Sequence, residues 1–263
     1  MDFATIIGYT GGFLLVSVIG VWLAKGSVLT FIDAASVAIT LGGSLLATLA
    51  ASSMKKFVNF PKYFMIIFKV PVRKSNEIIL TLVSFSEKAR REGLLALEDD
   101  LTELEDEFLR KGLQLVVDGT DPELVKTILY ADTDAMESRH ARVIKMFENM
   151  GYLAPAFGMI GTLIGLILAI AAGIDDKSAL IAGVATALIT TYYGAIMANL
   201  FFLPAASKLT DLHEDEVQIR DIMINGILAI QSGDNPRIVK DRLVSFLEPA
   251  DRKAISEEVE EKK

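Results

Sequence analysis

Residues 151–170 read GYLAPAFGMIGTLIGLILAI, an apolar run that contains one proline, Pro155, and one threonine, Thr162. A helix of roughly 20 apolar residues crosses the hydrocarbon core of a bilayer. The chain as a whole is also apolar, since 52% of its 263 residues are hydrophobic and its mean hydropathy is +0.43. Soluble domains are less hydrophobic, so the sequence predicts a membrane protein.

Four runs of this kind occur, at approximately residues 4–24, 31–53, 151–172 and 178–203. Of the 26 lysines and arginines, 15 lie in residues 54–150 and 9 in the tail from residue 204, while the two short connections carry only Lys25 and Lys177. Cytoplasmic loops are enriched in these residues, so we expect both termini and the long segment to be cytoplasmic. No basic segment precedes the first run, so we expect it to be a retained span rather than a signal peptide.

The segments outside the spans have helical patterns. Apolar residues between 94 and 117 recur at helical rather than alternating spacing. Asp118-Gly119 ends this pattern, and Asp121-Pro122 supplies an N-cap and a first-turn proline for another helix. A turn at residues 233–236 separates two tail helices. We therefore predict an all-α protein with transmembrane helices 1 and 2 in residues 1–54, a cytoplasmic helical domain in 55–150, transmembrane helices 3 and 4 in 151–203, and cytoplasmic C-terminal helices in 204–263.

Several classes of function lack the residues that they need. The chain has no cysteine and only two histidines, His140 and His213, in no metal-binding spacing. Its net charge of −8 argues against a nucleic-acid partner. The sequence shows no nucleophile–base set and no phosphate-binding loop, so we expect neither an enzyme nor a bound cofactor.

The spans also lack the intramembrane charge that ion and proton pathways usually contain. Only the second span carries an ionisable residue, Asp33, and it lies near the outer end of that span. Either this chain conducts nothing, or a partner subunit supplies the titrating group. Asp33 itself could tune ion access or anchor the helix.

Hydroxyl groups are the other polar feature of the spans, at Thr162 in the third span and Thr190 and Thr191 in the fourth. Hydroxyl and carbonyl oxygens can replace the hydration shell of a small cation. Alternatively, each threonine could bond only to its own backbone, and the GxxxG of residues 161–165 could serve only packing. Thr190 and Thr191 lie about 100° apart on a helix, so periodicity does not choose between them.

Each of the last two spans has a proline near one end. Pro155 cannot donate a hydrogen bond to the carbonyl of Gly151 and should bend the third span there. Pro204 occupies the equivalent end of the fourth span, which runs in the opposite direction.

Six motifs follow one another along essentially the whole chain: Gly11-Gly12-Phe13, FID at 31–33, ARREGLLALED at 89–99, LAPAFGMIGTLIGL at 153–166, TTYYGAIMANLFFLPAASKL at 190–209 and GILAIQSGDNPRIV at 226–239. In this order they resemble the motifs of the MotA family, the A subunits of bacterial flagellar stators, and most closely those of its sodium-driven PomA type.

The resemblance implies a stator A subunit of the bacterial inner membrane. Five such subunits ring two single-span subunits of the MotB/PomB type, whose aspartate binds the travelling ion, and the cytoplasmic domain pushes the rotor protein FliG. Pro155 and Pro204 match the prolines that couple ion flow to movement. Thr162 and Thr191 match the threonines of sodium-driven members, which favours Na⁺ over H⁺ as the transported ion.

The resemblance also gives a role to a group of exposed-looking charges, which in an unknown protein would usually be a solvated helix surface. Arg90 and Glu98 match the charged pair that engages FliG, and Arg91 and Asp99 match additional charges of the sodium-driven members. The chain departs from those members at Leu101, where they can carry another acid.

Two other membrane functions fit the sequence less well than a stator subunit. A stand-alone channel or transporter would need the missing intramembrane charge and shows no inverted repeat. An energising subunit of the ExbB/TolQ type resembles the last two spans, but such proteins have three spans and a different loop order.

Overall fold

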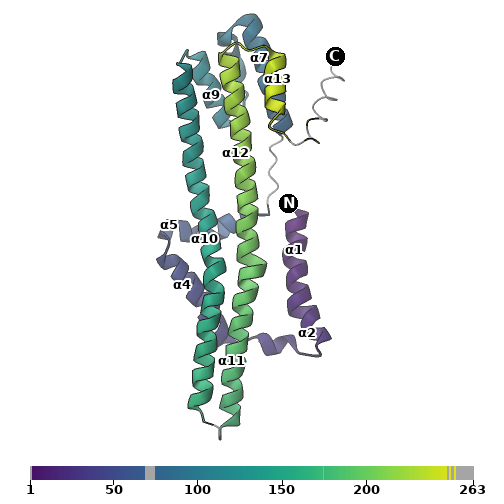
Figure 1. The fold of residues 1–263 in the computed structure, drawn as a ribbon, viewed down its shortest axis with the longest axis vertical. Helices are drawn as coiled ribbons and strands as arrows, with labels where there is room; N and C mark the ends of the chain where they lie inside the picture. Colours follow the sequence, from purple (N-terminus) through teal and green to yellow (C-terminus); the bar gives the residue numbers. More distant parts are fainter. Residues whose placement is uncertain (1, 69–74, 174, 248, 250–251, 253–263) are drawn as a thin grey trace. The chain divides into compact units, whose positions relative to one another are not determined.

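The computed structural model describes residues 2–68, 75–173, 175–247, 249 and 252. These residues form helices and no strand, which confirms the predicted all-α class. The chain divides into two compact units, one made of residues 1–70 and 140–211 and the other of residues 71–139 and 212–263. Two long helices, α10 (Pro122–Ala171) and α12 (Leu203–Gln231), contribute residues to both units (Figure 1).

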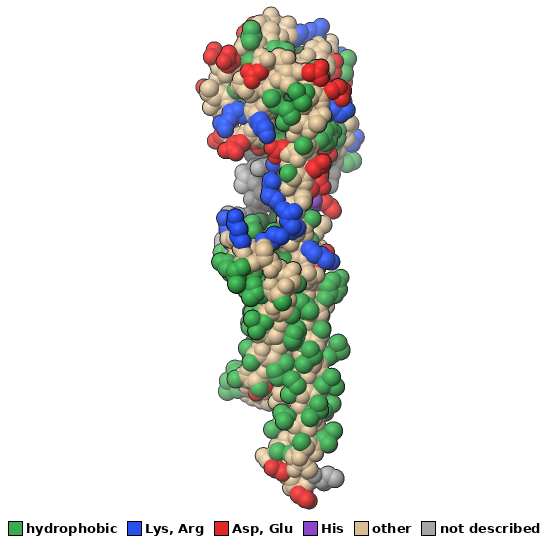
Figure 2. Space-filling model, turned by 90° about the vertical axis from the view of Figure 1, so that its left-hand side faces the viewer, with side chains coloured by type: hydrophobic (Ala, Val, Ile, Leu, Met, Phe, Trp, Pro, Cys, Tyr) green, Lys and Arg blue, Asp and Glu red, His purple; other side chains and the backbone are tan. Residues whose placement is uncertain are grey.

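The first unit contains the apolar spans. Its first span is one continuous helix, Phe3–Leu23, made of α1 (Phe3–Phe13), a π-helical segment and α2 (Gly20–Leu23). By length and composition, Phe3–Leu23, Pro122–Ala171 and Lys177–Gln231 could cross a membrane. Large hydrophobic side chains are exposed along these helices (Figure 2), as expected of a surface that meets lipid or other subunits.

The second predicted span is shorter than expected. Its helix is Ala34–Ala50, built from α3 (Ala34–Val37), a π-helical segment and α4 (Gly43–Ala50), whereas residues 28–31 form a separate 3₁₀ turn. The Asp33 carboxylate accepts a hydrogen bond from the Ser36 N–H and so starts the helix after residue 33. Two short helices, α5 (Met54–Val58) and α6 (Phe60–Ile66), follow this span.

The third and fourth predicted spans are parts of longer helices. The third is the last part of α10, and the fourth is α11 (Lys177–Ile196) followed by the π-helical Met197–Phe202 and the start of α12. Residues 123–150 contain neither proline nor glycine, so α10 begins at Pro122, well before the hydrophobic run, and ends with that run at Ala171.

Small residues allow α10 and α11 to lie close together. A Cβ atom added to Gly165 would lie 2.4 Å from the Gly183 carbonyl oxygen, and one added to Gly183 would lie 2.5 Å from the Gly165 carbonyl oxygen. Spacings of three and four residues place the buried members of this interface on one face of each helix: Ala154, Gly158, Gly161, Gly165 and Ala169 in α10, and Gly183, Ala187, Thr190 and Gly194 in α11.

The second unit has its own apolar core. It comprises α7 (Ser75–Glu92), the 3₁₀ turn Leu94–Leu97, α8 (Glu98–Leu101), α9 (Glu107–Val117), the first part of α10, the later part of α12 and α13 (Pro236–Val244). Its core includes Leu82, Leu113, Leu129 and Ile227.

The predicted helix boundaries in this unit are partly correct. The helical pattern of residues 94–117 is broken at residues 102–106, where the Asp106 carboxylate caps α9. The predicted stop at Gly119 is confirmed by its φ of 73°. The start at Pro122 is confirmed by the Asp121 carboxylate, which accepts hydrogen bonds from the N–H groups of Glu123 and Leu124. The predicted turn at residues 233–236 is also confirmed, since α12 ends at Gln231 and α13 begins at Pro236.

Candidate functional site

Thr162 of α10 and Thr191 of α11 bring their hydroxyl groups together. The two Oγ1 atoms lie 2.6 Å apart. Both hydroxyls also lie within hydrogen-bonding distance of the Ala187 carbonyl oxygen, at 3.0 Å from Thr162 and 3.2 Å from Thr191, and Thr162 reaches the Gly158 carbonyl oxygen at 3.1 Å. Thr162 is half-buried and Thr191 is exposed, so this cluster of four oxygens lies at an open face of the α10–α11 pair.

Thr190 lies about 100° around α11 from Thr191 and faces into the helix interface. Its side chain is fully buried, and a Cβ atom added to Gly161 would lie 2.4 Å from its Cγ2 atom. Its hydroxyl donates to the carbonyl oxygens of Thr186 and Ala187, both at 2.9 Å. The structure thus separates two neighbours that the sequence pattern left equivalent, although their roles in an ion pathway stay predictions.

The next two residues of α11 form hydrogen bonds with the first span and with residues 31–33, just before the helix of the second span. The Tyr192 hydroxyl donates to Ser17 Oγ at 3.0 Å. The Tyr193 hydroxyl donates to the Phe31 carbonyl oxygen and accepts a hydrogen bond from the Asp33 N–H at 3.4 Å. Of the four consecutive residues 190–193, Thr190 and Thr191 therefore lie against α10, whereas the two tyrosines contact the first span and residues 31–33.

Asp33 caps the second span with one carboxylate oxygen. Its Oδ2 atom accepts from the Ser36 N–H at 2.7 Å and from the Ser36 hydroxyl at 2.5 Å. Asp33 forms no ion pair with Lys25 or with any other described residue. The carboxylate therefore has a structural role as a cap and keeps its Oδ1 atom for another contact.

A stripe of hydroxyl residues on the second span escaped prediction. Its four members are fully buried and recur every fourth residue: Ser36, Thr40, Ser44 and Thr48. The hydroxyls of Ser36 and Thr40 reach carbonyl oxygens of α11, at Thr186 (3.5 Å) and Thr190 (3.4 Å). The four-residue spacing was visible in the sequence, but it reads equally well as ordinary small residues in an apolar helix.

The two prolines lie in different backbone surroundings. Helix α10 continues through Pro155, and a Cβ atom added to Gly194 of α11 would lie 3.0 Å from the Pro155 Cα atom and 2.6 Å from the Ala154 carbonyl oxygen. Pro204 directly follows the π-helical turn Met197–Phe202 and the first residue of α12. A π-helical turn widens the backbone before a proline, whose ring would clash with the carbonyl group four residues earlier.

The chain is similar to known proteins over nearly its whole length. A family model described as the MotA/TolQ/ExbB proton channel family matches residues 100–222. The motility protein A of Borreliella burgdorferi is 44% identical over 261 residues, which cover 98% of this chain and 99% of that protein. The chain belongs to the motility protein A family.

Another relative and two solved structures are similar to the chain. The chemotaxis protein PomA of Vibrio alginolyticus is 37% identical over 96% of this chain and 98% of its own length. The solved structure of C. jejuni MotAB matches with a TM-score of 0.88 at 29% identity over 95% of this chain and 97% of that chain. The flagellar MotAB stator complex from Bacillus subtilis matches with a TM-score of 0.87 at 31% identity. The chain is a multi-pass membrane protein with the function of a flagellar stator A subunit, and the ExbB/TolQ and stand-alone channel alternatives are set aside.

The predicted rotor-facing charges lie in the second unit, at the end of α7 and the start of α8. Arg90 and Arg91 are in the last turn of α7, and Glu98 and Asp99 are in the first turn of α8. All four side chains are exposed and form no ion pair with a described residue. An adjacent ion pair, Lys88–Asp100 at 2.8 Å, joins the two helices, and its hydrogen bond raises the pKa of Lys88. Leu101, where the resemblance allowed an acid, is instead buried in the core.

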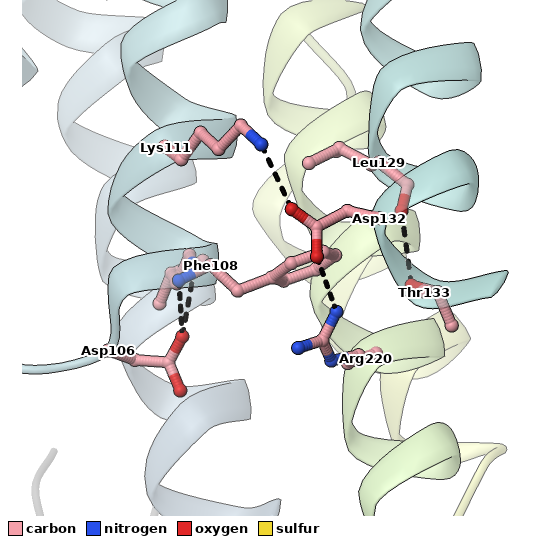
Figure 3. Close-up of polar contacts among 8 residues, drawn as sticks. Asp106, Phe108, Lys111, Leu129, Asp132, Thr133 and Arg220 are labelled. Atoms are coloured by element: carbon pink, nitrogen blue, oxygen red, sulfur yellow. Dashed lines mark hydrogen bonds and ion pairs between the residues drawn. The ribbon is translucent and has the colours of Figure 1, made fainter. Parts of the chain in front are cut away.

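An ionic contact that the sequence did not reveal joins three helices of the same unit (Figure 3). Asp132 of α10 accepts from Lys111 of α9 at 2.9 Å and from Arg220 of α12 at 3.1 Å. The Arg220 guanidinium also lies 4.5 Å from the centre of the Phe108 ring, within the range of a cation–π contact. The Lys111 hydrogen bond, followed by that of Arg220, holds the pKa of Asp132 below its usual value.

Proposed function

We propose that this chain, with a single-span B subunit of the MotB/PomB type, forms the ion pathway of a flagellar stator and converts inward ion flow into torque on the rotor. The observation that carries the proposal is the Thr162–Thr191 hydroxyl pair on the open face of α10 and α11. The helices Phe3–Leu23, Ala34–Ala50 and the apolar parts of α10 and α11 contain no charged residue. The titrating carboxylate of the pathway therefore comes from the B subunit.

The oxygen cluster favours Na⁺ as the transported ion. A hydroxyl has one proton and two lone pairs, so Thr162 can donate to Thr191 and Thr191 to the Ala187 carbonyl oxygen while each hydroxyl oxygen keeps a lone pair for a cation. A Na⁺ ion that loses water needs such oxygen ligands, whereas a proton can pass to a carboxylate without them. Resemblance to the sodium-driven PomA type supports the same choice, and no resident cofactor is needed.

The test is the swimming speed of cells that carry this chain and its B partner, measured against external Na⁺ at fixed pH, beside Thr162→Ala. We expect speed to rise and saturate with Na⁺ and to collapse in the variant. Thr162→Ser, which keeps the hydroxyl, is the matched control and should retain most of the speed. If the wild-type speed depends on pH and not on Na⁺, the stator is proton-driven and the threonine serves only packing.

The rotor contact is proposed to use Arg90 and Glu98 against opposite charges on FliG, with Arg91 and Asp99 beside them. Their exposure and lack of ion-pair partners among the described residues support this role. Exposed charge pairs contribute about 0–1 kcal/mol each, which suits a contact that forms and breaks repeatedly. We expect Arg90→Glu to lower torque mildly and the double variant with Glu98→Lys to lower it more. Lys126→Glu, an exposed reversal on α10, should not lower it.

The assembly is proposed to be a ring of five A subunits around two B subunits in the inner membrane, with both termini cytoplasmic. The distribution of lysine and arginine supports this orientation. Because the chain has no cysteine, single cysteines at the exposed Ser178 and Ser245 can be labelled with a membrane-impermeant maleimide. Only Ser178→Cys should react in intact spheroplasts, and the opposite pattern would reverse the orientation. Native mass spectrometry of the purified complex counts the subunits.

A further inference from the structure

A hollow of about 440 Å³ lies between α1 and the start of α12, within the first unit. Its walls include Gly8 and Tyr9 of α1 and Leu200, Pro204 and Lys208 of the fourth span and its continuation. A Cβ atom added to Gly8 would meet nothing within 4 Å, so the hollow is open at this glycine, whereas Gly12, one turn further, is closed by Leu200. Its volume is in the range of sites that bind small molecules.

The walls change from polar to apolar in the same direction on both helices. On α1, Asp2 and Thr5 precede Gly8 and Tyr9; on the antiparallel helix, Asp211, Lys208 and Ser207 lie on the far side of Pro204 and Leu200. One end of the hollow is therefore lined by charges and hydroxyls and the other by apolar surface. The apolar end adjoins the membrane spans. The hollow therefore changes from polar to apolar in the same direction as a phospholipid molecule does from its headgroup to its acyl chains.

The charged residues at the polar end suit a ligand that carries both a negative and a positive group. The Lys208 ammonium lies 2.8 Å from Asp2 Oδ2, which leaves it two further N–H groups. Both oxygens of Asp2 are occupied, by the N–H of Ala4, the hydroxyl of Thr5 and Lys208. Asp211 is exposed and forms no ion pair with a described residue.

We propose that this hollow binds one molecule of phosphatidylethanolamine, with its phosphate on Lys208, its primary ammonium on Asp211, and the first part of an acyl chain against Gly8, Leu200 and Pro204. Phosphatidylglycerol has the phosphate but no cation for Asp211. Phosphatidylcholine has a cation that cannot donate a hydrogen bond to a carboxylate. The site would place a lipid directly against Pro204, and it does not depend on which ion the stator uses.

The experiment measures lipid retained by the detergent-purified complex of this chain with its B subunit, after incubation with phosphatidylethanolamine, phosphatidylglycerol or phosphatidylcholine of identical acyl chains. Native mass spectrometry counts bound lipids per A subunit. We expect phosphatidylethanolamine to be retained best. Gly8→Leu fills the hollow and should lower its retention by roughly tenfold, as should Lys208→Gln or Asp211→Asn.

Two matched controls test whether the hollow itself is responsible. Gly11 is equally open to an added Cβ atom but does not line the hollow, so Gly11→Leu should leave retention unchanged. Lys126→Gln makes the same chemical change as Lys208→Gln at an exposed lysine of α10 that does not line the hollow, and it should also leave retention unchanged. Equal retention of the three lipids, a preference for phosphatidylglycerol, or equal losses in the two glycine variants would overturn the proposal. So would a changed number of A subunits in Gly8→Leu with lipid retention unaltered, because the hollow would then be a subunit contact.

Discussion

The hydroxyl oxygens of Thr162 and Thr191 lie 2.6 Å apart across the α10–α11 interface and share the Ala187 carbonyl oxygen as an acceptor. The close approach of the two helices at Gly158 and Gly161 makes this contact possible, because larger residues there would push the backbones apart. The close packing of the two helices therefore also positions the proposed ion ligands.

The first prediction separates the two neighbouring threonines of α11. Thr191→Val has nearly the same shape but removes a proposed Na⁺ ligand, so the Na⁺ concentration for half-maximal swimming speed should rise by roughly tenfold. Thr190→Val makes the same chemical change inside the helix interface and should leave that concentration unchanged. Thr191→Ser should remain close to wild type. Equal shifts in the two valine variants would show that the orientation of the hydroxyl does not matter.

The second prediction separates the two roles left open for Asp33. Asparagine caps a helix about as well as aspartate, whereas alanine does not, so Asp33→Ala should lower the free energy of unfolding by about 1 kcal/mol and Asp33→Asn should hardly change it. Because the carboxylate has no ion-pair partner among the described residues, we expect its charge to attract cations. Both variants should therefore raise the Na⁺ concentration for half-maximal speed by about two- to threefold at low ionic strength. An Asp33→Asn motor with the wild-type Na⁺ dependence would leave only the capping role.

The third prediction concerns the contact between Gly194 and the backbone at Pro155. An alanine Cβ at position 194 would lie 2.6 Å from the Ala154 carbonyl oxygen, and backbone cannot move aside as a side chain can. Gly194→Ala should lower the free energy of unfolding by about 1–3 kcal/mol and reduce torque, because it separates the helices at Pro155. Gly42→Ala, on the second span, meets nothing within 4 Å and is the control. Thermal unfolding of the purified complex and tethered-cell rotation measure the two effects, and similar melting temperatures for both variants would contradict the close contact.

Much of this fold was predictable because its signals are local. Hydropathy gave the four apolar segments, and the Asp121-Pro122 pair gave the start of α10. The continuation of α10 and α12 past the apolar segments could not be read in the same way, since hydropathy marks where a helix meets lipid and not where it ends. Likewise, the orientation of Thr190 and the contact of Asp132 with Arg220 depend on partners that are 29 or more residues away in the sequence.

The last prediction concerns Asp132, which joins α9, α10 and α12. Arg220 is only 12% exposed, and its Nε atom is buried without a hydrogen-bond partner, whereas Lys111 is 51% exposed. Asp132→Ala leaves the guanidinium with no ionic partner at this contact and should lower the free energy of unfolding by about 1–3 kcal/mol. Lys111→Met removes only the exposed half of the contact and should cost less than about 1 kcal/mol.

The pH dependence of this effect has a definite sign. The pKa of Asp132 is lower in the folded protein than in the unfolded chain, so its contribution to stability is present above the unfolded pKa and is lost as pH falls through the folded pKa. The difference in unfolding free energy between wild type and Asp132→Ala should therefore be constant near neutral pH and shrink in acid. Denaturant unfolding at a series of pH values measures it, with Lys111→Met as the reference. A difference that persists unchanged at the lowest pH would mean that Asp132 stabilises the unit by packing rather than by its charge.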